Sequence, residues 1–459
     1  MRTSIAWLSA CVLSFGASAL SAQEAISASQ AAEMAISNSD DLKITAASLN
    51  ARSGAVFWAY RAFFPNLQIQ YADNETISET LSDDFSKSIT LSLTQLLWDG
   101  NRTVTGIKLE AASINVARAE LARKALEVGD NAITLYRKVL MLRANRNVTA
   151  SALEATRTQM EIVKKEKELG LARTMDMADI RVQEIETSIE LAKTSQGLKE
   201  AERSLLIAIG GEPLPRLSEA IDVSYRGFDA DLELISGEAE SRNPSIVQLE
   251  ASVAQKRQSS ALADASWLPT LSFKASGSVG GDEFPLTEAS WSATLSVDFE
   301  DPAISGGSAL SYSGNATKDR KGALSQNATP LPSGTDHMAR RNARLAFETE
   351  ANKLKLAKEQ VRGSLESLID DYALKRNVRD LGDEKLAVVV AKRDLVSAKL
   401  NLGQATRSEL VEADIDVFKA RISLISAEAD VLAGERALES FLDFQPGGLA
   451  DFISREKSR

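Results

Sequence analysis

The 459-residue sequence has few of the residues that build most catalytic and metal sites. It contains one cysteine, Cys11, and one histidine, His337. A single cysteine excludes a disulfide within the chain, and a single histidine excludes a histidine metal cluster. The formal net charge of −11 argues against a nucleic-acid partner. There is no catalytic triad, no glycine-rich phosphate loop and no ligand cluster beyond carboxylates. The sequence therefore predicts no enzyme activity, no cofactor and no bound metal.

Long apolar runs are also absent. No stretch of about eighteen consecutive apolar residues follows residue 22, which excludes a transmembrane helix. Residues 1–22 are typical of a secretory signal, with a charged start, a short apolar stretch and a small-residue exit. We expect cleavage after Ala22, with Ala19 as the alternative, and either cut would remove Cys11. The letters of a lipidation box at Leu8-Ser9-Ala10-Cys11 leave lipidation of Cys11 open.

The sequence is internally duplicated. A constant offset of 204 pairs Thr90-Leu91-Ser92 with Thr294-Leu295-Ser296. Further along, an offset of 233 pairs Leu169-Gly170 with Leu402-Gly403. The offsets differ by 29 (233 − 204), so the second half carries a net insertion between these points. Residues 304–341 are rich in Gly, Ser, Asn, Thr and Pro, which predicts that the insertion is a loop.

Four segments alternate apolar and polar residues with the period of a β-strand. They are Leu67–Tyr71, Ile89–Leu93, Leu271–Ala275 and Ala293–Val297. Polar turn regions join them as two hairpins, over 66–98 and 270–299. Four strands cannot close a barrel, and open strand edges are not tolerated in lipid. If these strands meet a membrane, several chains must share them. The alternative is an ordinary four-stranded sheet in a soluble domain.

Two helical hairpins of unusual length follow the strands, over 103–210 and 342–442. Each carries apolar residues in heptad steps and breaks at a glycine, Gly170 or Gly403. Shorter helices precede the strands in each half. We therefore expect these domains: a signal at 1–22, repeats at 23–218 and 219–445, and a tail at 446–459. A plain coiled coil would leave the strands unexplained.

These features together resemble the TolC family of outer-membrane efflux proteins. The resemblance rests on the domain order, the duplication and three short motifs. The motifs are Phe64-Pro65 and Leu268-Pro269 before the strands, Leu97-Trp98-Asp99-Gly100 before the first long helix, and the Leu-Gly breaks. The resemblance implies a mainly α fold with a β-barrel portion. Three chains with four strands each would form a twelve-stranded barrel, continued by a twelve-helix α-barrel. Leu67, Ile69 and Tyr71 would face lipid, and Gln68 and Gln70 the lumen.

One departure from the family pattern lies after the second strand pair. There Glu300-Asp301-Pro302 and the 29-residue insertion stand in place of an Asp-Gly turn. We expect the inserted loop near the junction of barrel and tunnel, or in the belt around the helices. The sequence leaves open whether the loop narrows the channel, contacts a partner or is disordered.

The resemblance also implies a function. The protein would be the passive exit duct of a tripartite efflux or type I secretion system in the outer membrane of a Gram-negative bacterium, extending into the periplasm. Its partners would be two further copies of itself, a periplasmic adaptor (membrane fusion) protein, an inner-membrane transporter and outer-membrane lipid. The alternative is a soluble periplasmic coiled-coil scaffold or adaptor. The cargo, whether drug, metal or protein, is not encoded in a recognisable motif.

The candidate gate residues lie beside the Leu-Gly breaks. Asp176 and Asp179 align with Glu409 and Glu412, and each pair is spaced i, i+3, which places both carboxylates on one helix face. Such acids could line a constriction, or they could merely suit the first turn of a helix through its dipole. By resemblance, Thr406-Arg407 matches the family's gating arginine, which ties neighbouring helices together. The tips expected to contact the adaptor are Gly170, Leu171, Arg173, Gly403 and Gln404.

Overall fold

The computed structural model describes residues 25–76, 84–169, 174–211, 216–217, 232–300, 304–315, 317–330 and 335–457. The chain divides into two units. One comprises residues 1–42, 124–239 and 363–459, and the other comprises residues 43–123 and 240–362. The predicted signal, residues 1–22, lies outside the described residues. No helix within the described ranges combines the length and the apolar character that crossing a membrane requires.

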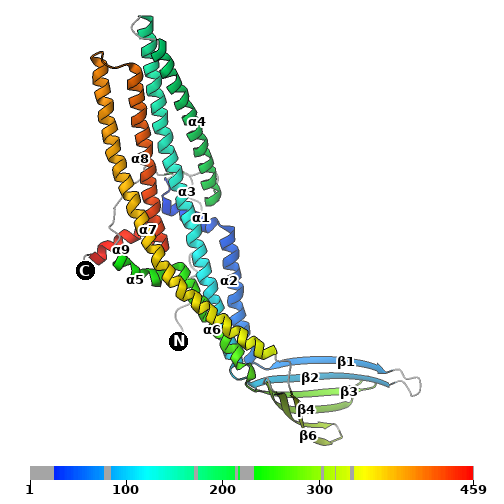
Figure 1. Ribbon diagram of the computed structural model, residues 1–459. Helices are drawn as coiled ribbons and strands as arrows, with labels where there is room; N and C mark the ends of the chain where they lie inside the picture. Colours follow the sequence, from blue (N-terminus) through cyan, green and yellow to red (C-terminus); the bar gives the residue numbers. More distant parts are fainter. Residues whose placement is uncertain are drawn as a thin grey trace. The chain divides into compact units, whose positions relative to one another are not determined.

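All described strands belong to one antiparallel sheet in the second unit. Its strands neighbour one another in chain order, as Figure 1 shows. They are β1 Asn66–Thr76, β2 Asp84–Trp98, β3 Thr270–Gly281, β4 Glu288–Glu300, β5 Ile304–Asn315 and β6 Arg320–Pro330. The two predicted hairpins correspond to β1–β2 and β3–β4. The prediction of four strands is wrong, because the described part of the chain contains six.

The third hairpin occupies the segment that the sequence predicts as a loop. Instead of a loop over 304–341, the structure has β5, β6 and the start of α7 at Thr335. β5 pairs with β4, and β6 with β5, along nearly their whole lengths. A tight turn joins them, in which Asn315 Oδ1 accepts hydrogen bonds from Asp319 N at 2.9 Å and Thr317 Oγ1 at 2.7 Å. The small polar residues of this segment therefore build strands.

The long helices form two hairpins. The first consists of α3 (Arg102–Glu168) and α4 (Thr174–Ile209), and the second of α7 (Thr335–Asn401) and α8 (Arg407–Phe441). Helices α3 and α7 each contain 67 residues, and the offset of 233 relates both of their ends. Likewise, the offset of 204 relates the starts of β1 and β3 and of β2 and β4. The change of offset thus falls between β4 and α7, where the β5–β6 hairpin lies.

The shorter helices before the strands are each interrupted. The first set is α1 (Ala28–Asn38), α2 (Asp40–Ala59) and the 3₁₀ turn η1 (Tyr60–Phe63). The second is α5 (Leu232–Arg242), α6 (Pro244–Asp264) and η2 (Ala265–Trp267), and α9 (Gly448–Lys457) follows the second hairpin. Asn243 separates α5 from α6, and its Oδ1 caps α6 by accepting from Ser245 N at 3.0 Å and Ile246 N at 3.3 Å.

A polar clamp joins the segment just before β3 to the start of α3. Arg102 donates from Nε to Ala265 O at 2.9 Å and from Nη2 to Leu268 O at 2.8 Å. Asp99 Oδ2 accepts from Thr103 N at 2.6 Å, which caps α3. Gly100 has φ +65°, and a Cβ there would lie 2.5 Å from Leu268 Cβ. The Asp99-Gly100 pair therefore supplies both a helix cap and a close approach that other residues would block.

One hydrophobic cluster of the first unit lies where α1 meets the first helical hairpin. Buried residues from α1, α3 and α4 form one cluster there, including Ala31, Tyr136, Val139 and Leu205. Tyr136 Oη donates to Ile26 O at 2.7 Å, and Ile26 N donates to Arg216 O at 2.8 Å. These bonds hold the chain before α1 against the segment that follows α4.

Candidate functional site

The turn between α7 and α8 ends in a well-formed helix cap. Gly403 has φ +71°, a conformation that glycine adopts without a steric penalty. Thr406 is the N-cap of α8: its Oγ1 accepts from Glu409 N at 3.2 Å, and Glu409 Oε2 accepts from Thr406 N at 3.2 Å. This is a reciprocal capping box. Glu409 therefore caps α8 in this chain, and its place at a constriction between several chains stays a prediction.

Arg407 joins the two helical hairpins. Its Nη2 lies 2.7 Å from Glu166 Oε1, and its Nε lies 2.9 Å from the same oxygen and 3.1 Å from Oε2. Its Nη1 also donates to Gln159 Oε1 at 3.3 Å. Glu166 and Gln159 belong to α3, whereas Arg407 begins α8. We call the Arg407–Glu166 pair the tip contact. Both side chains keep more than a quarter of their surface exposed, 27% for Arg407 and 29% for Glu166.

An apolar cluster lies beside the tip contact. Val163 of α3, Ile180 of α4, and Val411 and Ile415 of α8 form it, and Met160 and Met177 pack around it. Their burial brings the two hairpins together by the hydrophobic effect. The tip contact adds a charge-assisted, bidentate link to this contact surface.

The other predicted acids differ in how far they are exposed. Asp176 is half-buried in the first turn of α4, while Asp179 and Glu412 are exposed. A ring of such acids would need several chains and stays a prediction. Gly170, Leu171 and Arg173 lie outside the described residues. Among the described residues, no group of three or more His, Cys, Asp or Glu side chains could hold a metal ion.

The sequence indicates Arg407 as a site residue but not its partners. Glu166 lies 241 residues away in the chain, so no local pattern connects the two. One signal was available: Gln159 and Glu166 are seven residues apart, which places them on one face of α3. Only the packing of α8 against α3 shows that this face receives Arg407.

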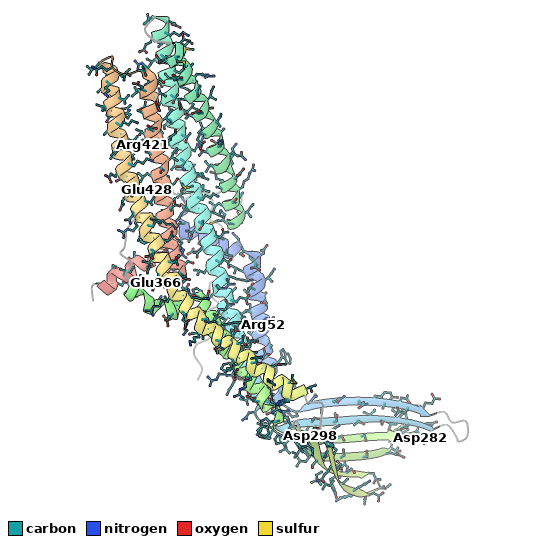
Figure 2. All side chains as sticks on the ribbon, in the orientation of Figure 1. Arg52, Asp282, Asp298, Glu366, Arg421 and Glu428 are labelled. Carbon is teal, nitrogen blue, oxygen red and sulfur yellow. The ribbon has the colours of Figure 1, made fainter. Side chains whose placement is uncertain are left out.

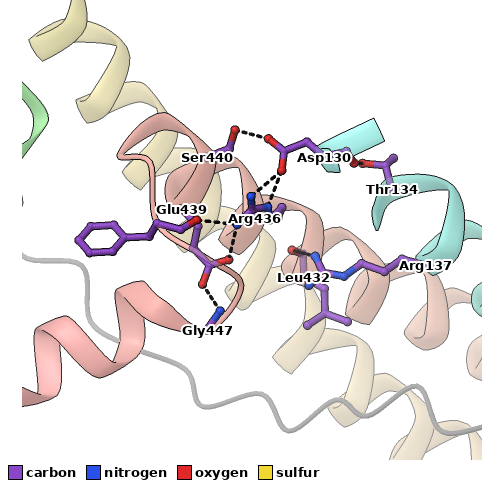
Figure 3. Close-up of polar contacts among 9 residues, drawn as sticks. Asp130, Thr134, Arg137, Leu432, Arg436, Glu439, Ser440 and Gly447 are labelled. Carbon is purple, nitrogen blue, oxygen red and sulfur yellow. Dashed lines mark hydrogen bonds and ion pairs between the residues drawn. The ribbon is translucent and has the colours of Figure 1, made fainter. Parts of the chain in front are cut away.

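A second arginine of α8 also binds an acid of α3, and Figure 3 shows the residues around it. Arg436 lies 2.6 Å from Asp130 Oδ1 and 3.3 Å from Glu439 Oε2, and its Nη1 donates to Phe444 O at 2.8 Å. Ser440 Oγ donates to Asp130, and Gly447 N donates to Glu439. We call these residues the Arg436 cluster. It fastens α3, α8 and the segment after α8 to one another.

Most of the Arg436 cluster is shielded from water, although Asp130 keeps 21% of its side chain exposed. The Arg436 side chain is 8% exposed and that of Glu439 is 1% exposed. Burial raises the pKa of Glu439 to about 7, although the charge of Arg436 acts in the opposite direction. Burial also raises the pKa of Glu435 and lowers that of the neighbouring Arg137. The pKa of Glu439 is thus close to neutral pH.

The sheet presents two chemically different faces. One face is apolar and exposed, because cross-strand neighbours such as Leu67 and Leu93, or Ile69 and Leu91, lie on the same side. The other face carries paired hydroxyls: Ser272 with Ser296 at 2.6 Å, Ser276 with Ser292 at 2.7 Å and Ser278 with Ser290 at 2.7 Å. The apolar face has the character of a surface that meets lipid or protein, and the hydroxyl face that of a surface that meets water.

The chain is similar to known channel proteins in part of its sequence and in its fold. A family model described as outer membrane efflux protein matches residues 31–211. No curated protein sequence gives a significant match. Among solved structures, CusC has a TM-score of 0.75 at 14% identity, with 91% of this chain and 92% of that chain covered.

Two further channels show the same likeness. The Campylobacter jejuni CmeC outer membrane channel has a TM-score of 0.72 at 11% identity, covering 94% of this chain and 89% of that one. The outer membrane protein VceC of Vibrio cholerae has a TM-score of 0.70 at 13% identity, covering 90% and 95%. At such low identity the structures show the shared fold. Together with the family match, they confirm the resemblance to TolC-type outer-membrane efflux proteins.

Proposed function

We propose that this chain, which resembles outer-membrane efflux proteins in sequence and in fold, is a passive exit duct across the outer membrane and the periplasm. The observation that carries the proposal is the sheet, whose exposed apolar face backs a face of paired serines. A single chain leaves that apolar face and two strand edges uncovered. Several copies that share their edges would turn the apolar faces toward lipid and enclose the serines around water.

The duct would be a homotrimer that works with two kinds of partner. An inner-membrane transporter would supply the energy, since this sequence contains no nucleotide-binding motif. A periplasmic adaptor protein would contact the helix tips, at Gly170, Leu171 and Arg173 of the first hairpin and Gly403 and Gln404 of the second. Drug efflux and type I protein secretion both fit a duct of this kind.

We assign the tip contact to the closed state of the duct. Arg407 belongs to one helical hairpin and Glu166 to the other, so the hairpins cannot separate at this point while the pair is intact. Because both side chains are partly exposed, water can replace their bonds at low cost. Separation of the two hairpins would also expose the apolar cluster around Val163, and an adaptor bound at the tips could cover that surface.

Conductance in planar lipid bilayers tests both the duct and the gate. Arg407→Ser should raise the mean conductance or the open probability relative to the parent protein, because it removes every bond of the tip contact. Arg393→Ser is the matched control. Arg393 Nε binds Asp414 at 2.8 Å, but that pair joins α7 to α8 within one hairpin. Equal conductance of all three proteins would refute the gate, and no channel activity in any of them would refute the duct.

Cell fractionation without detergent separates the duct from the alternative of a soluble periplasmic scaffold. The exposed apolar face of the sheet favours the duct, so the protein should sediment with outer membranes and require detergent for release. Recovery in the soluble periplasmic fraction would instead favour the scaffold.

A further inference from the structure

The inserted hairpin extends the sheet without changing the end at which the chain leaves it. In the first repeat, residues 99–101 connect β2 directly to α3. In the second repeat, β5 and β6 lie between β4 and α7. Two added strands carry the chain out and back, so α7 starts from the same end of the sheet as α3. An even number of strands also leaves β6 antiparallel to β1. The strand directions therefore permit antiparallel pairing between β6 of one chain and β1 of another.

The two free edges of the sheet have opposite charge near the hairpin turns. β1 ends in Asp73 and Glu75, whereas β6 begins with Arg320 and Lys321. Without the inserted hairpin, the free edge would be β4, which begins with Glu288 at the same end of the sheet. An acidic β4 would then face an acidic β1 in the next chain. The hairpin thus replaces an edge that would repel β1 with an edge that would attract it.

The division of the sheet into an apolar and a polar face also continues as far as β6. One row of cross-strand neighbours runs through all six strands: Ile69, Leu91, Gly277, Trp291, Gly314 and Arg320. The ring of Trp291 lies over Gly314, where a Cβ would come within 2.9 Å of Nε1. Trp291 also contacts Tyr312, with ring centroids 5.5 Å apart. The apolar face therefore packs continuously from β4 onto the inserted hairpin.

These faces restrict the register in which two chains can pair. For the apolar faces to stay on one side, odd-numbered residues of β1 must lie opposite even-numbered residues of β6. One such register aligns nearly the whole of both strands. It sets Glu75 opposite Arg320 and Tyr71 opposite Leu324 on the apolar side, and Ala72 opposite Ala323 on the polar side. Asp73 already has a cation within its own chain, since Lys87 lies 3.8 Å away.

We propose that β6 of one chain pairs with β1 of a second copy in this register, so that the inserted hairpin is part of the barrel wall. The proposal rests on the trimeric duct proposed above and changes its dimensions. Three chains with six strands each give eighteen strands, in place of the twelve expected from the family resemblance. Because barrel diameter grows roughly linearly with strand number, the barrel would be about 1.5 times as wide and its cross-section roughly twice as large. Such a barrel would pass bulkier cargo.

Disulfide trapping in intact outer membranes tests the pairing. In a Cys11→Ala background, which has no other cysteine, Ala72→Cys is combined with Lys321→Cys, Ala323→Cys or Ser325→Cys. Lys321, Ala323 and Ser325 lie on the polar face of β6 and sample neighbouring registers. Ala72→Cys with Ser292→Cys, Thr294→Cys or Ser296→Cys is the matched control, because these residues of β4 would face β1 in a four-stranded arrangement. Oxidised samples are separated on denaturing gels without reductant.

The expected result is a covalent trimer from the Ala72 and Ala323 pair and monomers from all β4 pairs. A covalent trimer through β4, or a trimer by native mass without any β6 link, would overturn this proposal and leave the trimeric duct standing. A monomer by native mass would overturn both. A strong link through Lys321 or Ser325 in place of Ala323 would overturn the register.

Charge reversal supplies a second readout. Glu75→Lys and Arg320→Glu should each lower the fraction of trimer that resists dissociation on heating, and the double variant should restore it. Asp298→Lys is the control, because Asp298 lies on β4, inside the sheet of a single chain (Figure 2). Failure of the double variant to restore the trimer would contradict the pairing of Glu75 with Arg320.

Discussion

Two arginines of the same helix bind acids of the same neighbouring helix, yet their surroundings differ. At the start of α8, Arg407 binds Glu166 with more than a quarter of each side chain exposed. Near the end of α8, Arg436 binds Asp130, and its own side chain is 8% exposed. The first pair stands almost alone, whereas the second is part of a cluster with Glu439, Ser440 and the backbone after α8 (Figure 3).

The difference assigns separate roles to the two ends of the contact between α3 and α8. An exposed ion pair exchanges its bonds with water at little cost, so it can break and form again. A buried pair that loses one partner leaves a charge without compensation, so it stays closed. We therefore expect the hairpins to separate at the tips while the Arg436 cluster holds α3 and α8 together. Four experiments test this contrast.

The largest effect is expected at Arg436. Arg436→Ala would leave the buried Glu439 and the partly exposed Asp130 without their cation and should lower the free energy of unfolding by about 3–5 kcal/mol. Denaturant unfolding of the purified protein measures the loss. Arg421→Ala is the control, since Arg421 is an exposed residue of the same helix (Figure 2) and its loss should cost less than about 0.5 kcal/mol. Similar losses of unfolding free energy in both variants would mean that the buried Arg436 stabilises the protein no more than an exposed arginine does.

The pH dependence of stability should come from the Arg436 cluster. The pKa of Glu439 is raised from 4.5 to about 7 in the folded chain, so the folded state holds this proton more tightly than the unfolded state. The free energy of unfolding should therefore fall as the pH rises from about 4.5 to about 7, by roughly 3 kcal/mol, and level off above that range. Glu439→Gln should flatten this slope. A slope of the same size in the variant would assign the proton to another group.

Charge reversal at the tip should change the gate more than the stability. Arg407→Glu places two acids together and should increase channel activity, while the free energy of unfolding falls by no more than about 1 kcal/mol. The double variant Arg407→Glu with Glu166→Arg should return the conductance toward that of the parent. A loss of stability as large as that of Arg436→Ala would mean that the tip contact is structural.

The smallest effect is expected from salt. Raising the ionic strength from about 0.1 M to 1 M shortens the Debye length from about 10 Å to about 3 Å, which weakens exposed charge pairs. The closed state of the parent channel should become shorter-lived in single-channel records, after correction for the conductivity of the solution. Arg407→Ser has no tip contact to screen, and its closed lifetime should not respond. An equal response in both proteins would mean that the salt effect arises outside the tip contact.

Periodicity predicted most of the fold because it reports directly on which residues are buried. Alternation located β1 to β4, and heptad steps with a glycine break located the first helical hairpin within one residue at each end. The second hairpin was located less well, because α7 begins at Thr335, seven residues before the predicted start at 342. The same reasoning failed for β5 and β6, where glycine and serine suggested a loop. In the structure, Gly314 is small because Trp291 lies over it, and a Cβ on Gly307 would come within 2.3 Å of Asp298 Oδ1. Cross-strand packing, which a single sequence does not reveal, requires these small residues.

The site was predictable only where local rules apply. The spacing of Thr406 and Glu409 indicates a capping box, and the glycine break locates the tip to which Arg407 belongs. The partner of Arg407 was not predictable, because Glu166 comes from the other repeat. The Arg436 cluster was missed for the same reason: Asp130 and Arg436 are 306 residues apart.

The equal length of α3 and α7 has a consequence for how such a chain can change. Both helices contain 67 residues, although the inserted β5–β6 hairpin precedes only α7. One extra residue in either helix would advance its tip by about 1.5 Å and rotate it by roughly 100°. Arg407 and Glu166 would then no longer face each other. Insertions and deletions should therefore be tolerated in the sheet, where a hairpin was accommodated. They should not be tolerated within α3 or α7, because the two helices must keep equal lengths for their tips to meet.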